Sequence, residues 1–213
     1  MFNFLRKLLG GKQQPATQQQ NNEPEQMKFL VVGLGNIGAE YQGTRHNIGF
    51  TVVEALADQA GATWATARYG AVAEMRVKNQ QLLLLKPSTY MNLSGEAVRY
   101  WAQKKKIGLD HILVVVDDIA LPFGAIRMRG KGADGGHNGL KNIDQMLGSQ
   151  QYARLRFGVG NDFPRGAQVD YVLSHPGADE LAVLPERAKV ACDAIRAFCL
   201  SGIDFAMTHF NNK

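Results

Sequence analysis

The sequence predicts an α/β fold: a single domain with a twisted mixed β-sheet and helices on both of its faces. Three observations support this prediction. Short apolar runs, such as FLVVG and ILVVV, have the length and composition of buried strands. Segments with apolar residues at helical spacing alternate with these runs along the chain. The 213 residues, 45% of them hydrophobic, can form one full core but are few for two domains.

The first 26 residues differ in composition from the rest. They comprise a short basic segment, MFNFLRKLLG, and a tract rich in Gln, Asn and Pro, GKQQPATQQQNNEPEQ. Because such a tract has nothing to bury, we predict a disordered tail over residues 1–26 and a folded domain over residues 27–213. Arg6 and Lys7 interrupt the apolar stretch and no small-residue cleavage site follows, which argues against a secretory signal. A membrane-surface or partner-binding role is the alternative to a dispensable tail.

The folded domain is expected to begin with a buried strand, FLVVGLG, that glycines close. A helix follows, with Gly61 as its stop signal, and its apolar residues recur at helical spacing: Ile48, Val52, Val53, Leu56 and Ala60. Next come two strands paired across Asn79 and Gln80, with the sequences GAVAEMRV and QLLLLKP. The segment from Ser94 to Lys106 is predicted to be a helix, with Ser94 as its N-cap.

The second half of the domain continues this alternation. Its most apolar run, HILVVVDD, is expected to be a central strand. A further strand (AIRMRGKG), a short helix (GLKNIDQMLG) and another strand (RLRFGVG) follow it. The long C-terminal helix, ADELAVLPERAKVACDAIRAFCLSG, is expected to break near Pro185.

Composition limits the classes of protein to which the chain can belong. No stretch approaches the roughly 18 consecutive apolar residues of a membrane span, so none is predicted. Cys192 and Cys199 lie seven apart, which is the spacing of neither a redox pair nor a zinc knuckle. We interpret them as buried thiols of a protein in a reducing compartment, and we predict a cytoplasmic location.

The positive charge is concentrated in the middle of the chain. From Arg99 to Arg165 there are eleven Lys or Arg and six Asp or Glu, an excess equal to the net charge of +5. This distribution favours a polyanionic partner such as nucleic acid, although a solvated basic face produces the same pattern. The run Lys104–Lys106 is interpreted as such a solvated face. The residues expected to contact phosphates are Arg127, Arg129, Lys131, Lys141, Arg154 and Arg156.

Three glycines after the first strand match the G-x-G-x-x-G pattern of dinucleotide-binding sites: Gly33, Gly35 and Gly38. That site requires a helix that begins near the second glycine, with the pyrophosphate at its N-terminus. Here AEYQGTRHNIG follows, and helical spacing resumes only at Ile48. No acidic residue ends a second strand, because Glu54 and Asp58 fall within the predicted helix. We therefore discount a nucleotide-dependent oxidoreductase and predict a loop that approaches a ligand closely.

Two residues far apart in the chain are predicted to form a catalytic pair. His46 lies in the polar loop after the first strand, and Asp117 ends the most apolar strand. Ligands of open α/β sheets bind at the carboxyl ends of strands, where both residues are expected. If Asp117 accepts a hydrogen bond from one ring nitrogen of His46, the other nitrogen can act as a base near neutral pH. Asp118 is expected to point to the opposite face, as a solvent-exposed or structural residue.

Polar residues also follow other strands, in loops that lead into helices. Asn36, Asn92 and Asn138 each lie in such a loop, and His137 precedes Asn138. Amide side chains can hold an ester, a peptide backbone and a ribose without charge, although turns and helix caps are their alternative role. The loops contain neither a G-x-S-x-G nucleophile nor a zinc-ligand spacing. These residues therefore suit a hydrolase that activates water directly, without a metal or another cofactor.

Five of these segments together resemble the bacterial-type peptidyl-tRNA hydrolase family. They occur in the order found in that family: VVGLGNIGAEYQGTRHNIGF, KPSTYMNLSG, VVVDDIALPFG, GGHNGLK and RLRFGVG. The resemblance extends from about Lys28 to Phe210. It implies a cofactor-free, typically monomeric enzyme that binds the acceptor stem and 3′ end of peptidyl-tRNA and cleaves the peptide from the terminal ribose. Such an enzyme recycles tRNA from prematurely released peptidyl-tRNA and spares ordinary aminoacyl-tRNA.

The resemblance also implies roles for individual residues. His46 corresponds to the catalytic base, Asp117 to the carboxylate that orients it, and Asn36 to an asparagine beside the scissile ester. The residues expected to contact the substrate are Tyr41, Met91, Asn92, His137 and Asn138. The family often has an acidic residue where this chain has Ala120, which puts a secondary cleft contact in question. A catalytically inactive RNA-binding protein with the same fold is the alternative, but it would have no need for this set of polar residues.

Overall fold

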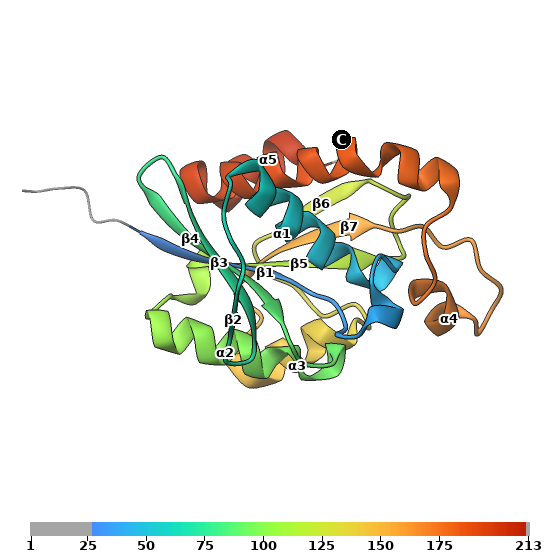
Figure 1. Cartoon of the computed structure of the whole chain (residues 1–213), viewed down its shortest axis with the longest axis horizontal. Coiled ribbons are helices and arrows are strands. Elements are labelled where there is room, and N and C mark those ends of the chain that lie inside the picture. The colour runs from blue at the N-terminus through green and yellow to red at the C-terminus, as the bar shows by residue number, and fades with distance from the viewer. Residues whose placement is uncertain (1–26, 212–213) are drawn as a thin grey trace, which may run out of the picture.

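Figure 1 shows the computed structural model, which describes residues 27–211 of the chain. The tail predicted over residues 1–26 lies outside the described residues. Seven strands form one mixed sheet in the order β2-β3-β4-β1-β5-β7-β6, and helices cover both of its faces. The fold class predicted from the sequence, a single α/β domain with a twisted mixed sheet, is therefore confirmed.

The central strands of the sheet are parallel, and the strands at its edges are antiparallel. β1 pairs in parallel with β4 and β5, and β5 pairs in parallel with β7. β2 and β3 extend the sheet beyond β4, and β6 extends it beyond β7, all antiparallel. β1 and β5 consist almost entirely of apolar residues because both of their faces are covered. The strands are β1 (Lys28–Gly33), β2 (Ala65–Ala67), β3 (Gly70–Val77), β4 (Gln80–Pro87), β5 (Ile112–Asp118), β6 (Ile126–Arg129) and β7 (Ala153–Gly158).

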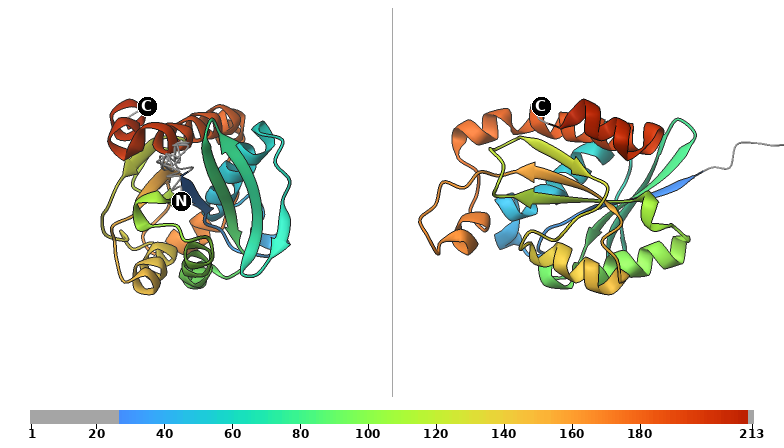
Figure 2. Two further views of the ribbon diagram at one scale, coloured as in Figure 1. Left: turned by 90° about the vertical axis from the view of Figure 1, so that its left-hand side faces the viewer. Right: turned by 180° about the vertical axis from the view of Figure 1, so that it is seen from behind.

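Helices α1 and α5 pack on one face of the sheet, and α2 and α3 pack on the other (Figure 2). Neighbouring residues of a strand point to opposite faces, so Val31 joins the core with α1 and α5, whereas Val32 joins the core with α2 and α3. The helices are α1 (Ile48–Gln59), α2 (Ser94–Lys105), α3 (Asn138–Leu147), α4 (Gln168–Val172) and α5 (Ala178–Phe210). Within residues 27–211, none of them combines the length and the apolar character that crossing a bilayer requires.

Two details of the helices differ from the predictions. Ser94 is not the N-cap of α2, because its own backbone is helical and its hydroxyl donates to the carbonyl of Met91 at 2.8 Å. α5 does not break near Pro185; its backbone leaves the helical region at Gly202 (φ 82°, ψ 174°) and then continues to Phe210. Glycine adopts this conformation because it has no Cβ to clash. The short elements β2 and α4 were not predicted, since three to five residues carry too little periodicity.

Packing explains the glycines after β1 without a nucleotide. A Cβ on Gly33 would overlap the carbonyl group of Gly49, and a Cβ on Gly49 would overlap the carbonyl oxygen of Val115 in β5. The start of α1 can therefore lie directly against β1 and β5 only because both positions are glycine. As the sequence predicts, α1 begins at Ile48, well after Gly38.

Four chain segments meet at the carboxyl edge of the parallel strands. The loop after β1 contains a short helix over Arg45–Asn47, and the loop after β4 contains another over Met91–Leu93. β5 ends at the same edge, and the segment that leads into α3 lies beside it. Open α/β sheets bind their ligands at this edge, so the fold brings the loops with polar residues to one place.

Candidate active site

An open cleft of about 390 Å³ lies where these segments meet. Its walls also include residues of α4. The cleft brings together eight residues that were predicted for the site from separate parts of the chain: Asn36, His46, Met91, Asn92, Asp117, His137, Asn138 and Arg156. These polar side chains therefore converge on a space large enough for a ligand.

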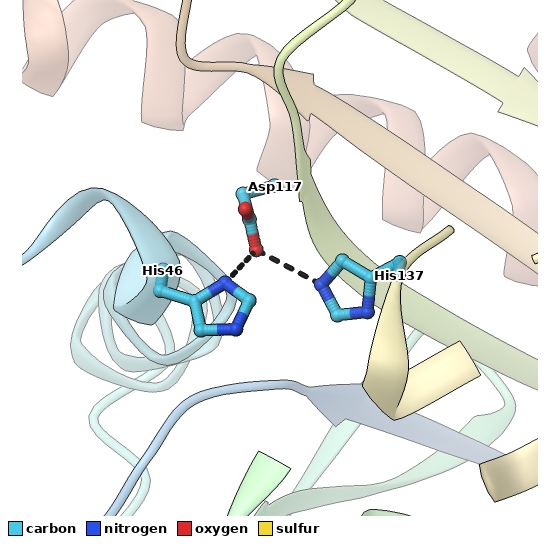
Figure 3. A group of neighbouring side chains, drawn as sticks. All are labelled: His46, Asp117 and His137. Atoms are coloured by element: carbon cyan, nitrogen blue, oxygen red, sulfur yellow. Dashed lines mark hydrogen bonds and ion pairs between the residues drawn. The ribbon is translucent and has the colours of Figure 1, made fainter. Parts of the chain in front are cut away.

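Figure 3 shows three of these residues, in which one carboxylate oxygen serves two histidines. Oδ1 of Asp117 lies 2.8 Å from Nδ1 of His46 and 3.0 Å from Nε2 of His137. The Asp117 side chain is 4% exposed, whereas those of His46 and His137 are 15% and 10% exposed. A buried carboxylate thus holds two imidazole rings that reach the cleft.

Asp117 is held in its ionised form. Burial alone would raise the pKa of this carboxyl group, but the charges and hydrogen bonds of His137 and His46 outweigh burial and hold the pKa well below its usual range. Because an ionised carboxylate can only accept, Nδ1 of His46 carries the proton of their hydrogen bond. Nε2 of His46 is then unprotonated in the neutral ring, and no group within residues 27–211 is hydrogen-bonded to it.

A buried arginine next to His46 fixes the loop that carries this histidine. The guanidinium of Arg45 donates to Oγ of Ser174 at 2.8 Å and to the carbonyl of the next residue. It also lies 2.6 Å from a carboxylate oxygen of Glu180 and 4.3 Å from the ring centroid of Tyr171. The loop is thereby tied to the segment between α4 and α5. Arg45 was not among the residues predicted for the site, although the sequence T-R-H-N places it beside the histidine.

Asn47 was also missed, and it fixes the loop directly after β1. Its Oδ1 accepts from the backbone N–H of Asn36 at 2.8 Å, and its Nδ2 donates to the carbonyl of Asn36 at 2.9 Å. The side chain of Asn36 is oriented in turn, because its Oδ1 accepts from the backbone N–H of Met91 at 2.8 Å. With its oxygen engaged in this way, Asn36 offers its Nδ2 amino group to the cleft as a donor.

Of the other residues predicted to contact the substrate, all but Tyr41 line the cleft. Asn92 and Asn138 are exposed and line the cleft, and Met91 lines it as a buried residue. His137 is the N-cap of α3, because its Nδ1 accepts from backbone N–H groups of the first turn. Tyr41 lies in a short helix of the loop after β1 and is not among the residues that line this cleft.

Arg154 does not contact phosphate; this prediction was wrong. Its side chain is fully buried, and its guanidinium donates to the carbonyls of Gly132 and Ala133. It also lies 3.6 Å from a carboxylate oxygen of Asp144 in α3. Arg154 therefore holds the loop before α3 from beneath. The loop covers this arginine only in the folded structure, so spacing along the chain could not separate it from the exposed cations.

Asp118 follows Asp117 as the last residue of β5. It was expected on the opposite face of the sheet from Asp117, and its contact with Arg156 fits this, because Arg156 lies opposite Val116, which belongs to the core with α2 and α3. At the end of the strand it also lines the cleft. Its side chain is 9% exposed, so it is structural and not solvent-exposed: it lies 3.3 Å from Nη1 of Arg156 and accepts from the backbone N–H of Ala120 at 2.8 Å.

The remaining basic candidates lie around the loop before α3. Arg156 lines the cleft and is paired with Asp118. Four further cations form no salt bridge within residues 27–211 and reach the surface on β6, on the loop after it and on α3: Arg127, Arg129, Lys131 and Lys141. These four lie on or near the loop over residues 130–137 and are not among the residues that line the cleft, and Arg129 donates to the carbonyl of Met128.

The three clustered side chains also have the spacing of metal ligands, because their donor atoms lie within 4.8 Å of one another. The hydrogen bonds of His137 disfavour that use. Its Nδ1 accepts from the backbone N–H of Gly139 at 3.1 Å, so a metal on Nε2 would require loss of the only ring proton. Histidines that bind metals instead donate a hydrogen bond from their second nitrogen. The donor set therefore fits a hydrogen-bond network better than a metal centre.

The fold and the cleft define an α/β protein with a histidine oriented by a buried carboxylate, as in hydrolases that use general-base catalysis. The protein-family model described as peptidyl-tRNA hydrolase matches residues 30–213 of this chain. The chain belongs to the peptidyl-tRNA hydrolase family, and the resemblance stated from the sequence motifs is confirmed.

Relatives in this family match over nearly their full length. The chain is 59% identical over 187 residues to the peptidyl-tRNA hydrolase of Phocaeicola vulgatus, covering 88% of this chain and 100% of that protein. It is 58% identical over 185 residues to the enzyme of Porphyromonas gingivalis, covering 87% and 100%. The crystal structure of peptidyl-tRNA hydrolase from Acinetobacter baumannii aligns with a TM-score of 0.81 at 32% identity, covering 86% of this chain and 94% of that chain.

Proposed function

We propose that this peptidyl-tRNA hydrolase cleaves the ester between a peptide and the 3′-terminal ribose of tRNA with a water molecule that His46 activates. Family membership supports the reaction. The observation that carries the mechanism is the 2.8 Å hydrogen bond between Nδ1 of His46 and the ionised Asp117 in an open cleft. A protein that only bound RNA would have no use for this pair, so hydrolysis is favoured over passive binding.

In the proposed mechanism, Nε2 of His46 removes a proton from water as the water oxygen attacks the ester carbonyl. Asp117 stabilises the imidazolium that forms. The tetrahedral intermediate collapses, the ribose oxygen leaves, and the imidazolium returns the proton to that oxygen. The products are a free peptide carboxylate and a tRNA with an intact 3′ end. General-base catalysis contributes roughly 10²–10⁴-fold, so positioning of the ester must supply much of the remaining acceleration.

Asparagines supply the neutral contacts of this mechanism. Nδ2 of Asn36 is the donor that we assign to the oxyanion of the tetrahedral intermediate, because its amide is already oriented by Met91. One such donor is typically worth ~3 kcal/mol. Asn92 and Asn138, on other walls of the cleft, are assigned to the peptide and to the terminal nucleotide.

Salt dependence tests the proposed contact between the acceptor stem and the surface cations on β6, on the loop after it and on α3. Four or five phosphate contacts predict that affinity for tRNA falls about 100-fold between roughly 50 and 200 mM salt. Lys141→Ala should reduce the slope of log affinity against log salt by about one, whereas Lys189→Ala, on the exposed side of α5, should leave it unchanged. Filter binding measures both slopes. An affinity that stays flat with salt would assign these cations to solubility instead.

Selectivity for blocked substrates tests the proposed reaction. We expect the protein to release N-acetyl-aminoacyl groups from tRNA and to leave unblocked aminoacyl-tRNA intact, because the asparagines that line the cleft can hydrogen-bond the amide of a blocked group. The measurement is acid-precipitable radioactivity with the two substrates in parallel, with heat-inactivated protein as the control. Equal release from both substrates, or release from neither, contradicts the proposal.

We also propose that the enzyme acts in the cytoplasm, as a monomer in line with the family resemblance. Cys192 and Cys199 are buried, free thiols of α5. Burial raises the pKa of Cys192 to about 11 and that of Cys199 to about 12, so both remain protonated and unreactive. Two such thiols suit a protein that works in a reducing compartment.

A further inference from the structure

We propose that His137 is a positioning residue for Asp117: the N-terminus of α3 fixes its tautomer, and its other nitrogen donates permanently to the carboxylate that orients His46. The proposal rests on the proposed function, because it assigns His137 an effect on the base of that reaction. It also replaces the substrate contact that the sequence analysis expected of His137.

The tautomer of His137 follows from its place at the start of α3. The residue has an extended backbone (φ −80°, ψ 113°), as an N-cap requires. Its Nδ1 accepts from the backbone N–H groups of Gly139 at 3.1 Å and Leu140 at 3.4 Å. A ring nitrogen that accepts a hydrogen bond carries no proton, so the proton of the neutral ring is on Nε2.

The protonated nitrogen of His137 faces Asp117. Nε2 lies 3.0 Å from Oδ1, the same oxygen that accepts from Nδ1 of His46 at 2.8 Å. The two rings are 5.2 Å apart between centroids (Figure 3). One carboxylate oxygen therefore accepts hydrogen bonds from two N–H donors. Each hydrogen bond withdraws negative charge from that oxygen and so weakens the other hydrogen bond.

The two histidines differ in whether their second ring nitrogen is hydrogen-bonded. Adding a proton to Nδ1 of His137 would break the cap of α3 and place a positive charge at the positive end of the helix dipole. His46 has no such restraint on its Nε2 within the described part of the chain. The other charged groups that line the cleft are Asp118, Asp134 and Arg156. Asp118 is paired with Arg156, and Asp134 accepts from a backbone N–H, which leaves Asp117 as the carboxylate that faces both rings.

This arrangement has a consequence for the base. The N–H group of His137 holds the carboxylate of Asp117 in place. It also weakens the hydrogen bond that this carboxylate accepts from His46. The imidazolium form of His46 is therefore less stabilised than it would be beside a carboxylate with a single partner. Removal of the His137 donor should therefore change the pH dependence of the reaction in which His46 accepts a proton from water.

Two substitutions separate the two functions of the ring. Asparagine places its amide oxygen near the position of Nδ1, so His137→Asn keeps an N-cap but is too short to reach Asp117. Glutamine places its amide nitrogen near the position of Nε2, so His137→Gln keeps a donor to Asp117 but loses the cap. The pair is matched in polarity and charge, and one variant serves as the control for the other.

We expect His137→Asn to retain the melting temperature, to lower kcat/KM at neutral pH roughly threefold to tenfold, and to move the acid-side midpoint of the pH profile up. His137→Gln should keep the wild-type midpoint and melt about 2–4 °C lower. If His137→Asn keeps the wild-type pH profile, or if the profile moves only in the variant that melts lower, His137 is a helix cap alone and the proposal is overturned.

A measurement on the intact wild-type protein tests the tautomer without catalysis. Long-range ¹H–¹⁵N NMR of the ¹⁵N-labelled chain should show His137 protonated on Nε2 and unprotonated on Nδ1, and the state should persist while His46 titrates. A proton on Nδ1 at neutral pH overturns the proposal. If the wild type instead fails to cleave blocked substrates, the proposed function falls while the tautomer can still be read, so the two failures are distinguishable.

Discussion

Replacing His46 with alanine is expected to lower kcat by at least about two orders of magnitude while tRNA still binds. The imidazole is the only unengaged base that Asp117 orients toward the cleft within residues 27–211. Its removal leaves the water without a proton acceptor but leaves the asparagines and the surface cations in place. The measurement is steady-state cleavage of N-acetyl-aminoacyl-tRNA, with binding followed separately by filter retention.

A second histidine provides the control for this experiment. His209 is exposed near the end of α5, where its ring stacks on Phe205, and it is not among the residues that line the cleft. His209→Ala should therefore turn over at the wild-type rate. Near-normal turnover by the His46→Ala protein would contradict the mechanism, and so would a loss of tRNA affinity large enough to explain the lower rate.

The substitution Asp117→Asn is expected to lower kcat by about three orders of magnitude. It removes the charge that stabilises the imidazolium, and its amide can donate to Nδ1 of His46, which selects the wrong tautomer for a base on Nε2. The same amide also faces the N–H of His137, so the network loses an acceptor for two donors. A rate within about threefold of the wild type would show that the carboxylate has no part in catalysis.

The neighbouring carboxylate is the matched control for Asp117→Asn. Asp118 lies in the same cleft and at the same strand end, but it is paired with Arg156 and faces neither histidine. Asp118→Asn should lower kcat by less than about tenfold, since it removes one partly exposed ion pair. If both substitutions cost the same, the effect of Asp117 would be one of general charge in the cleft and not of its bond to His46.

The ionisation of Asp117 also links the site to stability. Its pKa lies below the ordinary value of 3.8, so the unfolded chain takes up the proton first as pH falls. The stabilisation that Asp117 provides is therefore complete above that ordinary value and is lost as pH falls through the lower, folded value.

Much of the fold could be predicted from the sequence, because it depends on local patterns. Apolar runs and helical spacing identify the central strands and the main helices, and alternation of the two identifies the class. The pairing of His46 with Asp117 was also predictable, since both follow strands that end at one edge of the sheet. The break in α5 at Gly202 was not, because proline near the start of a helix and glycine near its end give competing signals.

The supporting residues of the site could not be predicted, because their roles depend on contacts between distant segments. Arg45 is buried only because the segment after α4 folds over it, and Arg154 only because the loop before α3 covers β7. His137 could be recognised as a polar loop residue. Its bond to Asp117 depends on how the start of α3 is placed against the end of β5, and no spacing along the chain encodes that placement.

That Asp117 acts through His46 is tested most directly by the double variant His46→Ala/Asp117→Asn. Once the imidazole is gone, the carboxylate has no base to orient, so the double variant should cleave N-acetyl-aminoacyl-tRNA within about threefold of the slower single variant. If the two losses multiply instead, to about five orders of magnitude, the two residues act independently and a mechanism built on an oriented histidine is contradicted.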